Sequence, residues 1–140
     1  MNTRRLLRLA DFLEHEVKNK WFDLTFWATE GWKDRECGST ACALGWATAI
    51  PEFKQAGLKL KVELSYGQPR VPIYIPAYKE KERTSAGASF FGLSYDQASW
   101  LFSPWWYPES HTSRRYVAKR IRSFAETQGA NCPISSKHKE

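Results

Sequence analysis

Two cysteines lie in the most distinctive run of the chain, Cys37-Gly38-Ser39-Thr40-Ala41-Cys42. The run precedes a stretch that favours a helix, and the positive end of a helix dipole stabilises a thiolate. Cys37 is therefore a candidate nucleophile, and His111 is a candidate base for it. A hydrolase of this kind also needs a third group that orients the base. The sequence indicates no such group, so we expect a binding protein more than an enzyme.

The same run has other interpretations. The backbone N–H groups around Gly38 and the hydroxyls of Ser39 and Thr40 could hold a phosphate or a carboxylate where the helix begins. Alternatively, Cys42 is a small buried apolar residue, and the neighbouring glycines allow close packing. Zinc is a weaker alternative, because the cysteines and histidines of the chain show no recognised zinc spacing. We expect neither a metal nor a cofactor.

A basic helix follows an aromatic cluster in the last third of the chain. Five of the nine residues from 114 to 122 are Arg or Lys, and four of the eight residues from 100 to 107 are Trp or Tyr. Cations attract phosphates and aromatic rings stack on nucleobases, so the pair favours a nucleotide-like ligand. The alternatives are a solvated helix face and an aromatic plug over the core. The candidate ligand-binding residues are Gly38, Ser39, Thr40, Trp46, Trp105, Trp106, Tyr107, Arg114, Arg115 and Lys119.

The composition is that of one folded domain. The chain has 140 residues, of which 15% are aromatic, and a formal net charge of +6. We predict a single domain over residues 1–130 and a frayed tail over 131–140. No apolar stretch approaches the roughly 18 residues of a membrane span, and three cysteines are an odd number. We therefore expect a soluble, cytoplasmic protein with reduced thiols and no membrane partner.

Helical spacing and capping residues predict the elements that position these side chains. One amphipathic helix is predicted over 3–18, with Asn2 or Thr3 as its N-cap. A capping box of Ser94 and Gln97 begins another helix. The predicted helices are 3–18, 39–50 (stopped by Pro51), 86–91 (closed by Gly92), 95–102 and 113–127 (ended by Gly129).

Residues 58–64 alternate between apolar and charged side chains, which predicts a half-buried strand. Residues 71–76 are its predicted partner in a hairpin around Gly67, and their prolines confine that partner to the edge of the sheet. The aromatic segment 21–27 is predicted to pack on the core. The fold class is therefore a small α+β domain, mostly helical, with about five helices and one β-hairpin.

One family resemblance covers residues 3–124. The chain resembles a family of small bacteriophage and bacterial proteins to which no activity is attached. The residues that carry the resemblance are Cys37-Gly38-Ser39, Ala41-Cys42, Gly45-Trp46-Ala47, Ile50-Pro51-Glu52-Phe53 and Phe90-Phe91-Gly92-Leu93-Ser94. The resemblance implies a phage-type origin and, with it, a role in disarming host defences.

We therefore predict a non-enzymatic protein that captures an anionic, nucleotide-like molecule and so sequesters a host immune signal. A first alternative is an inhibitor that binds nucleic acid or a protein of a host defence complex. A second is a cysteine-dependent hydrolase that uses Cys37. Assembly into a homo-oligomer is compatible with each of the three.

Overall fold

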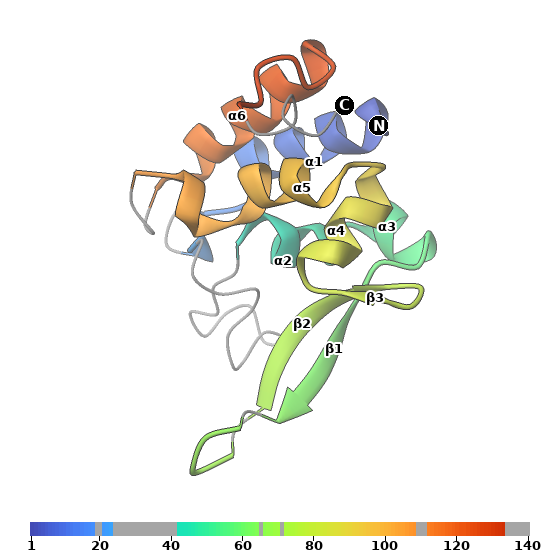
Figure 1. Ribbon diagram of the computed structural model, residues 1–140, viewed down its shortest axis with the longest axis vertical. Coiled ribbons are helices and arrows are strands. Elements are labelled where there is room, and N and C mark those ends of the chain that lie inside the picture. The colour runs from blue at the N-terminus through green and yellow to red at the C-terminus, as the bar shows by residue number, and fades with distance from the viewer. Residues whose placement is uncertain (19–20, 24–41, 65, 71, 109–111, 134–140) are drawn as a thin grey trace.

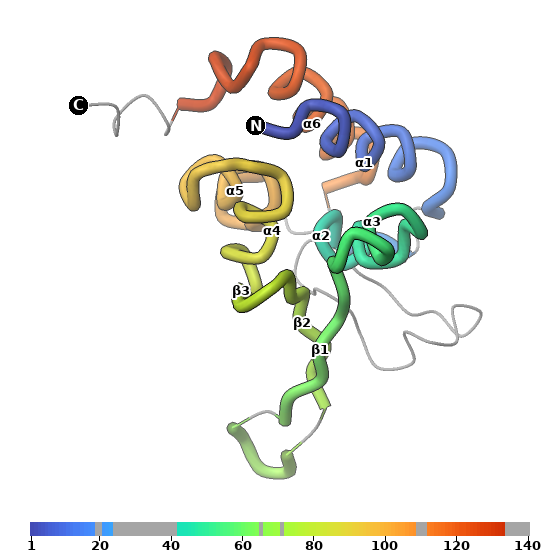
Figure 2. The backbone as a smooth tube through the Cα atoms, turned by 90° about the vertical axis from the view of Figure 1, so that its right-hand side faces the viewer, coloured from blue at the N-terminus to red at the C-terminus, as the bar shows by residue number. Residues whose placement is uncertain are grey.

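A computed structural model of the chain describes residues 1–18, 21–23, 42–64, 66–70, 72–108 and 112–133. In these ranges the chain forms six α-helices, the short 3-10 helix η2 and one three-stranded antiparallel sheet (Figure 1). The predicted α+β class is confirmed. The helices form the body of the molecule, and the β1–β2 hairpin projects from it (Figure 2).

The first and last helices pack side by side (Figures 1 and 2). Helix α1 spans Thr3–His15, and the Asn2 side chain caps it by accepting from Arg5 N at 3.0 Å. Helix α6 spans Arg114–Glu126 and is capped by Ser113, which accepts from Tyr116 N at 3.2 Å. Each helix buries one apolar stripe, so the two ends of the chain share one core.

The single helix predicted over 39–50 is wrong within the part that the structure describes. Helix α2 spans only Ala43–Ala47, with Cys42 at its N-cap, and helix α3 spans Pro51–Gln55. Pro51 therefore begins a helix instead of only stopping one. Proline fits the first helical position because the N–H that it lacks would be unpaired there anyway.

The predicted hairpin is confirmed, and a third strand extends it. Strand β1, Lys59–Leu64, pairs antiparallel with β2, Pro72–Tyr78, and β2 pairs with the two-residue strand β3, Lys81–Glu82. The proline-containing strand is therefore the middle strand and not an edge. Both prolines are tolerated because β3 pairs only with Ala77 and Tyr78, beyond Pro72 and Pro76.

Two short helices complete the body. Helix α4 spans Thr84–Phe91 and ends at Gly92 in the left-handed conformation, and helix α5 spans Tyr95–Phe102 behind the predicted capping box. The helix η2 spans Pro104–Trp106, within the aromatic cluster of residues 100–107. No helix in the described ranges has both the length and the apolar character needed to cross a membrane.

The core is one cluster that draws on every α-helix. It includes Phe22 and also Cys132, which belongs to the predicted tail; residues 134–140 of that tail lie outside the described ranges. Trp21 packs against this core, in agreement with the prediction for the start of segment 21–27, and residues 24–27 lie outside the described ranges.

Candidate functional site

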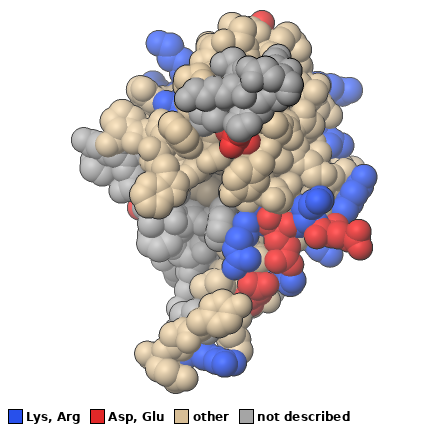
Figure 3. Space-filling model, viewed as in Figure 1, with Lys and Arg blue, Asp and Glu red and all other residues tan. Residues whose placement is uncertain are grey.

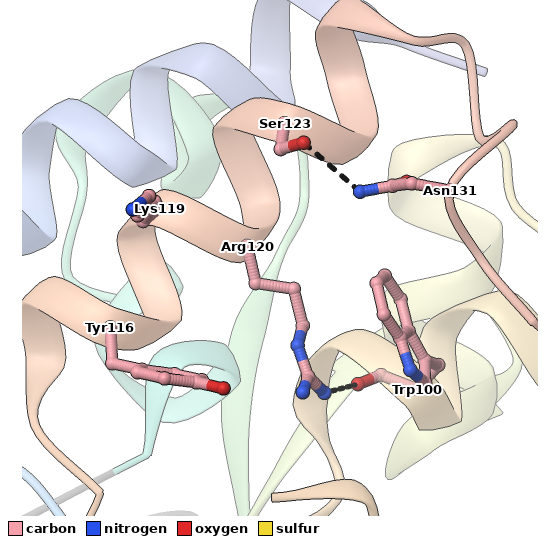
Figure 4. Close-up of a pocket in the computed structure, with 6 residues that line it drawn as sticks. All are labelled: Trp100, Tyr116, Lys119, Arg120, Ser123 and Asn131. Atoms are coloured by element: carbon pink, nitrogen blue, oxygen red, sulfur yellow. Dashed lines mark hydrogen bonds between the residues drawn. The ribbon is translucent and has the colours of Figure 1, made fainter.

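A cavity of about 330 Å³ lies between α5 and α6 (Figure 4). Trp100 lines it from α5, and Asn131 lines it from the segment after α6. The other lining residues, Tyr116, Lys119, Arg120 and Ser123, recur at helical spacing on α6. Residues three and four positions apart share one face of a helix, so α6 presents two cations, a phenol and a hydroxyl to the same space.

Arg120 is held in place by aromatic rings. Its guanidinium carbon lies 4.4 Å from the ring centre of Trp100, 3.8 Å from that of Tyr107 and 5.9 Å from that of Tyr116. Its Nη1 donates to the backbone oxygen of Trp100 at 2.9 Å. Figure 4 shows the side chain between the rings of Tyr116 and Trp100. A guanidinium has five N–H donors, so this one can donate further bonds while it stays fixed.

Polar groups on α6 and just beyond it form another side of the cavity. Asn131 donates to the Ser123 hydroxyl at 3.0 Å and accepts from the Thr127 hydroxyl at 3.2 Å. Lys119 is exposed, and Tyr116 exposes 48% of its surface. The described lining includes two cations and no carboxylate. The cavity therefore favours an anion with a flat, partly apolar portion.

The structure separates the three predicted basic residues of α6. Lys119 lines the cavity. Arg115 is exposed on the same helix but is outside that lining. Arg114 donates from Nη1 to the backbone oxygens of Leu13 and Glu14 at 2.9 and 2.6 Å, at the C-terminal end of α1. Arg114 therefore joins two helices, which accounts for it without a ligand.

Two of the predicted aromatic ligand-binding residues are buried. Trp46 lies in the core, where its indole N–H donates to the Trp21 carbonyl at 2.9 Å. The Tyr107 hydroxyl donates to the Leu101 carbonyl at 2.6 Å, and burial raises the pKa of this phenol. Both side chains have internal partners, so the expected direct contact of either with a ligand does not fit the structure.

Trp105 and Trp106 remain on the surface, with 87% and 45% of their surface exposed. The indole N–H of Trp106 donates to the Ser99 hydroxyl at 3.2 Å, and neither ring lines the cavity. The ring of Tyr107, directly after η2, lies 6.0 Å from that of Tyr116. This contact joins the end of the aromatic cluster to α6.

The cysteine motif is only partly within the described ranges. Cys37, Gly38, Ser39, Thr40 and His111 lie outside them. Cys42 is buried, and burial raises its pKa to about 11. Its interpretation as a small buried apolar residue is confirmed, since only 2% of its surface is exposed.

Sequence reasoning missed Tyr116, Ser123 and Asn131 as lining residues, and it named Trp100 and Arg120 only as members of larger clusters. The spacing of Tyr116, Arg120 and Ser123 along one helix face is a signal that could have grouped them. Asn131 offers no such signal, because its position depends on how the chain turns after α6.

Within the described ranges, no three His, Cys, Asp or Glu side chains gather in a way that could hold a metal ion. Comparisons with protein-family models, with curated proteins and with solved structures find no match to this chain. Its function must therefore be inferred from its own side chains.

Proposed function

We propose that this protein binds a nucleotide-like ligand, an anion that carries a planar ring, in the cavity between α5 and α6. The observation that carries the proposal is the fixed guanidinium of Arg120 beside Lys119 and two aromatic side chains. A cation that is already fixed donates hydrogen bonds to an anion more effectively than a mobile one, because little side-chain freedom is lost when the ligand binds.

The contacts that the cavity can make set an upper limit on the affinity for a ligand. A hydrogen bond to a charged group contributes about 1.5–3 kcal/mol, and a base stacked on an aromatic ring contributes about 1–3 kcal/mol. Two phosphate contacts from Lys119 and Arg120 and one stack on Tyr116 reach at most about 9 kcal/mol before the cost of immobilising the ligand. We therefore expect a dissociation constant no tighter than micromolar for a mononucleotide.

The proposed activity is capture without turnover. The side chains that line the cavity in the described ranges include no carboxylate, imidazole or thiol, the groups that most often act as bases or nucleophiles. Retention of an unchanged ligand is the behaviour that sequestration of a host signalling nucleotide requires. We extend the proposal to that phage-type role, for which the sequence resemblance is the support.

Calorimetric titration with millimolar AMP, cyclic AMP and inorganic phosphate tests the proposal. Lys119→Ala removes an exposed cation that lines the cavity, and Arg115→Ala is its matched control on the same helix. We expect Lys119→Ala to weaken nucleotide binding about tenfold, which is one charged contact discounted for solvent screening. Arg115→Ala should bind as the unaltered protein does.

A second variant separates the ring from the charge. Tyr116→Ala should weaken AMP binding by about fivefold or more and leave phosphate binding unchanged, because only AMP has a base to stack. Absence of any nucleotide heat at millimolar ligand, or equal losses in Lys119→Ala and Arg115→Ala, would remove the cavity as the site.

The exposed indoles favour a second candidate function, binding of single-stranded nucleic acid. Trp105 and Trp106 are exposed directly before Tyr107, whose ring lies 6.0 Å from that of Tyr116 on α6, and Arg115 is exposed on the same helix. Fluorescence anisotropy with a labelled oligothymidine tests it: Trp105→Ala and Arg115→Ala should each weaken binding, and affinity should fall steeply with salt. If Trp105→Ala and Arg115→Ala both leave mononucleotide binding unchanged, the cavity is favoured as the site instead.

A further inference from the structure

Strand β1 is the longer of the two edge strands of the sheet in the part of the chain that the structure describes. The strand order is β1-β2-β3, so β1 pairs with β2 on one side only. In Figure 1 it is the right-hand strand of the projecting hairpin, and Figure 2 views the molecule from that side. The outward N–H and C=O groups of an edge strand are a template on which another strand can pair.

The hairpin also exposes large apolar side chains. Val62 and Leu64 each expose 56% of their surface, and Tyr66, just beyond the strand, exposes 98%. Leu60 lies on the same face as Val62 and Leu64, since side chains alternate along a strand. An exposed apolar stripe on an edge strand is costly in water, and a second strand laid alongside would cover part of it.

We propose that β1 pairs antiparallel with β1 of a second copy of this chain, about a two-fold axis at Val62. In this register Leu60 lies opposite Leu64 of the second copy, and Lys61 lies opposite Glu63 of the second copy. The two-fold axis repeats each pair, so the edge is complementary to itself in both charge and apolarity.

The neighbouring registers are less favourable. An axis at Lys61 sets two lysines directly opposite each other, and an axis at Glu63 sets two glutamates opposite each other. Like charges in that position destabilise a strand pair. An axis between two residues sets charged side chains opposite apolar ones, as with Val62 and Lys61. Of these registers, only the axis at Val62 sets apolar side chains opposite apolar ones and opposite charges opposite each other from Leu60 to Leu64.

The charged face of the hairpin is already arranged for such pairing. Lys61 forms an ion pair with Glu82, and Glu63 forms one with Arg83 at 3.2 Å. Figure 3 shows cationic and anionic side chains interleaved where the hairpin joins the body. Lysines on an edge usually discourage pairing, but Lys61 has neutralising carboxylates beside it and would meet another. The dimer would continue this alternation across the two-fold axis.

Six residues per strand make a small interface, so we expect a dissociation constant of about 10–100 μM, typical of weak association. Sedimentation velocity from about 5 to about 500 μM protein therefore spans the transition. The unaltered chain should move from monomer to dimer over this range. A monomer at every concentration would overturn the proposal.

Charge reversal tests the register. Lys61→Glu leaves carboxylates at both positions 61 and 63, and Glu63→Lys leaves ammonium groups at both. Each variant should be monomeric alone, because like charges then oppose each other across the axis. An equimolar mixture of the two should form a heterodimer, because every opposed pair again has opposite signs.

Lys81→Glu is the matched control, since it reverses an exposed lysine on β3, away from the β1 edge. It should dimerise as the unaltered chain does, and circular dichroism should show all variants folded. A Lys61→Glu dimer as stable as the original, or a mixture that stays monomeric, would contradict this pairing. The test is independent of the proposed ligand, because no β1 residue lines the α5–α6 cavity.

Discussion

At the scale of single residues, Arg120 connects the cavity to the core. Its guanidinium carries a charge toward the cavity while it contacts the rings of Trp100 and Tyr107 and donates to the backbone of α5. The same group is therefore a candidate hydrogen-bond donor to an anion and also a link between α5 and α6. Loss of binding in an Arg120 variant would not separate these roles, and for that reason Lys119 is the better probe of the ligand.

The structural role of Arg120 is testable by itself. We expect Arg120→Ala to lower the free energy of unfolding by about 2–3 kcal/mol, because it removes a charged hydrogen bond to the Trp100 carbonyl and two close ring contacts. Arg115→Ala, an exposed position on the same helix, should stay within about 0.5 kcal/mol. Urea unfolding measures both, and equal effects would contradict this role.

Cys42 predicts a loss of stability in alkali. Burial raises the pKa of its thiol from 9.0 to about 11 in the folded protein. Between these values the unfolded thiol has released its proton and the folded one has kept it, so ionisation favours unfolding as the pH rises. We expect the free energy of unfolding to fall by a few kcal/mol between pH 9 and pH 11.

Cys42→Ala is the control for this pH dependence. In this variant the free energy of unfolding should fall less between pH 9 and pH 10 than in the unaltered protein, as measured by urea unfolding at each pH. A decline should remain above pH 10, since burial also raises the pKa of Tyr107 above its ordinary 10.0. An unchanged decline in Cys42→Ala would show that another group causes it.

At the scale of elements, helix ends illustrate what local sequence determines. Gly92 ends α4 at φ +69°, and a β-carbon there would lie 3.3 Å from Met1 N and Cα. Gly92→Ala should cost about 1–2 kcal/mol for the left-handed backbone alone, with the contact adding to it. Gly67→Ala is the control, because it meets no atom within 4 Å and needs no positive φ. Thermal unfolding should show a clear loss for the first and little change for the second.

Features that depend on a few neighbouring residues were predictable. The caps at Asn2 and Ser94 follow from short-range rules, and the structure has them. The alternation over 58–64 predicted a strand correctly, but not its half-burial, because Val62 and Leu64 are exposed on β1. Helix α3 was missed because Pro51 fits equally well after the end of one helix and at the first position of the next. Strand β3 was missed because two residues carry no periodicity.

The candidate site was less predictable than the elements, for a physical reason. An indole that stacks on a base and an indole that fills a core belong to the same residue type, and only tertiary packing distinguishes Trp105 from Trp46. Likewise Arg114 and Lys119 both belong to the basic stripe of α6. Arg114 donates to a backbone oxygen at the end of α1, whereas Lys119 lines the cavity.

At the scale of the whole molecule, α1 and α6 hold the two ends of the described chain together. Gln128, after α6, donates to the Thr3 hydroxyl at 3.2 Å, and Arg122 of α6 forms an ion pair with Glu14 of α1. The buried stripes of both helices belong to the one core cluster that also holds α2, α4 and α5. The helical body should therefore unfold as a unit, because no helix has a core of its own.

Phe124→Ala tests this cooperativity from one end of the chain. Phe124 is fully buried on α6, and its ring centre lies 6.2 Å from that of Trp100 on α5. The cavity left by the missing ring should cost about 3–5 kcal/mol. Because the body shares one core, the denaturant midpoints from tryptophan fluorescence and from far-ultraviolet circular dichroism should shift together. Separate midpoints would show that the helical body does not unfold as a unit, and would contradict a single shared core.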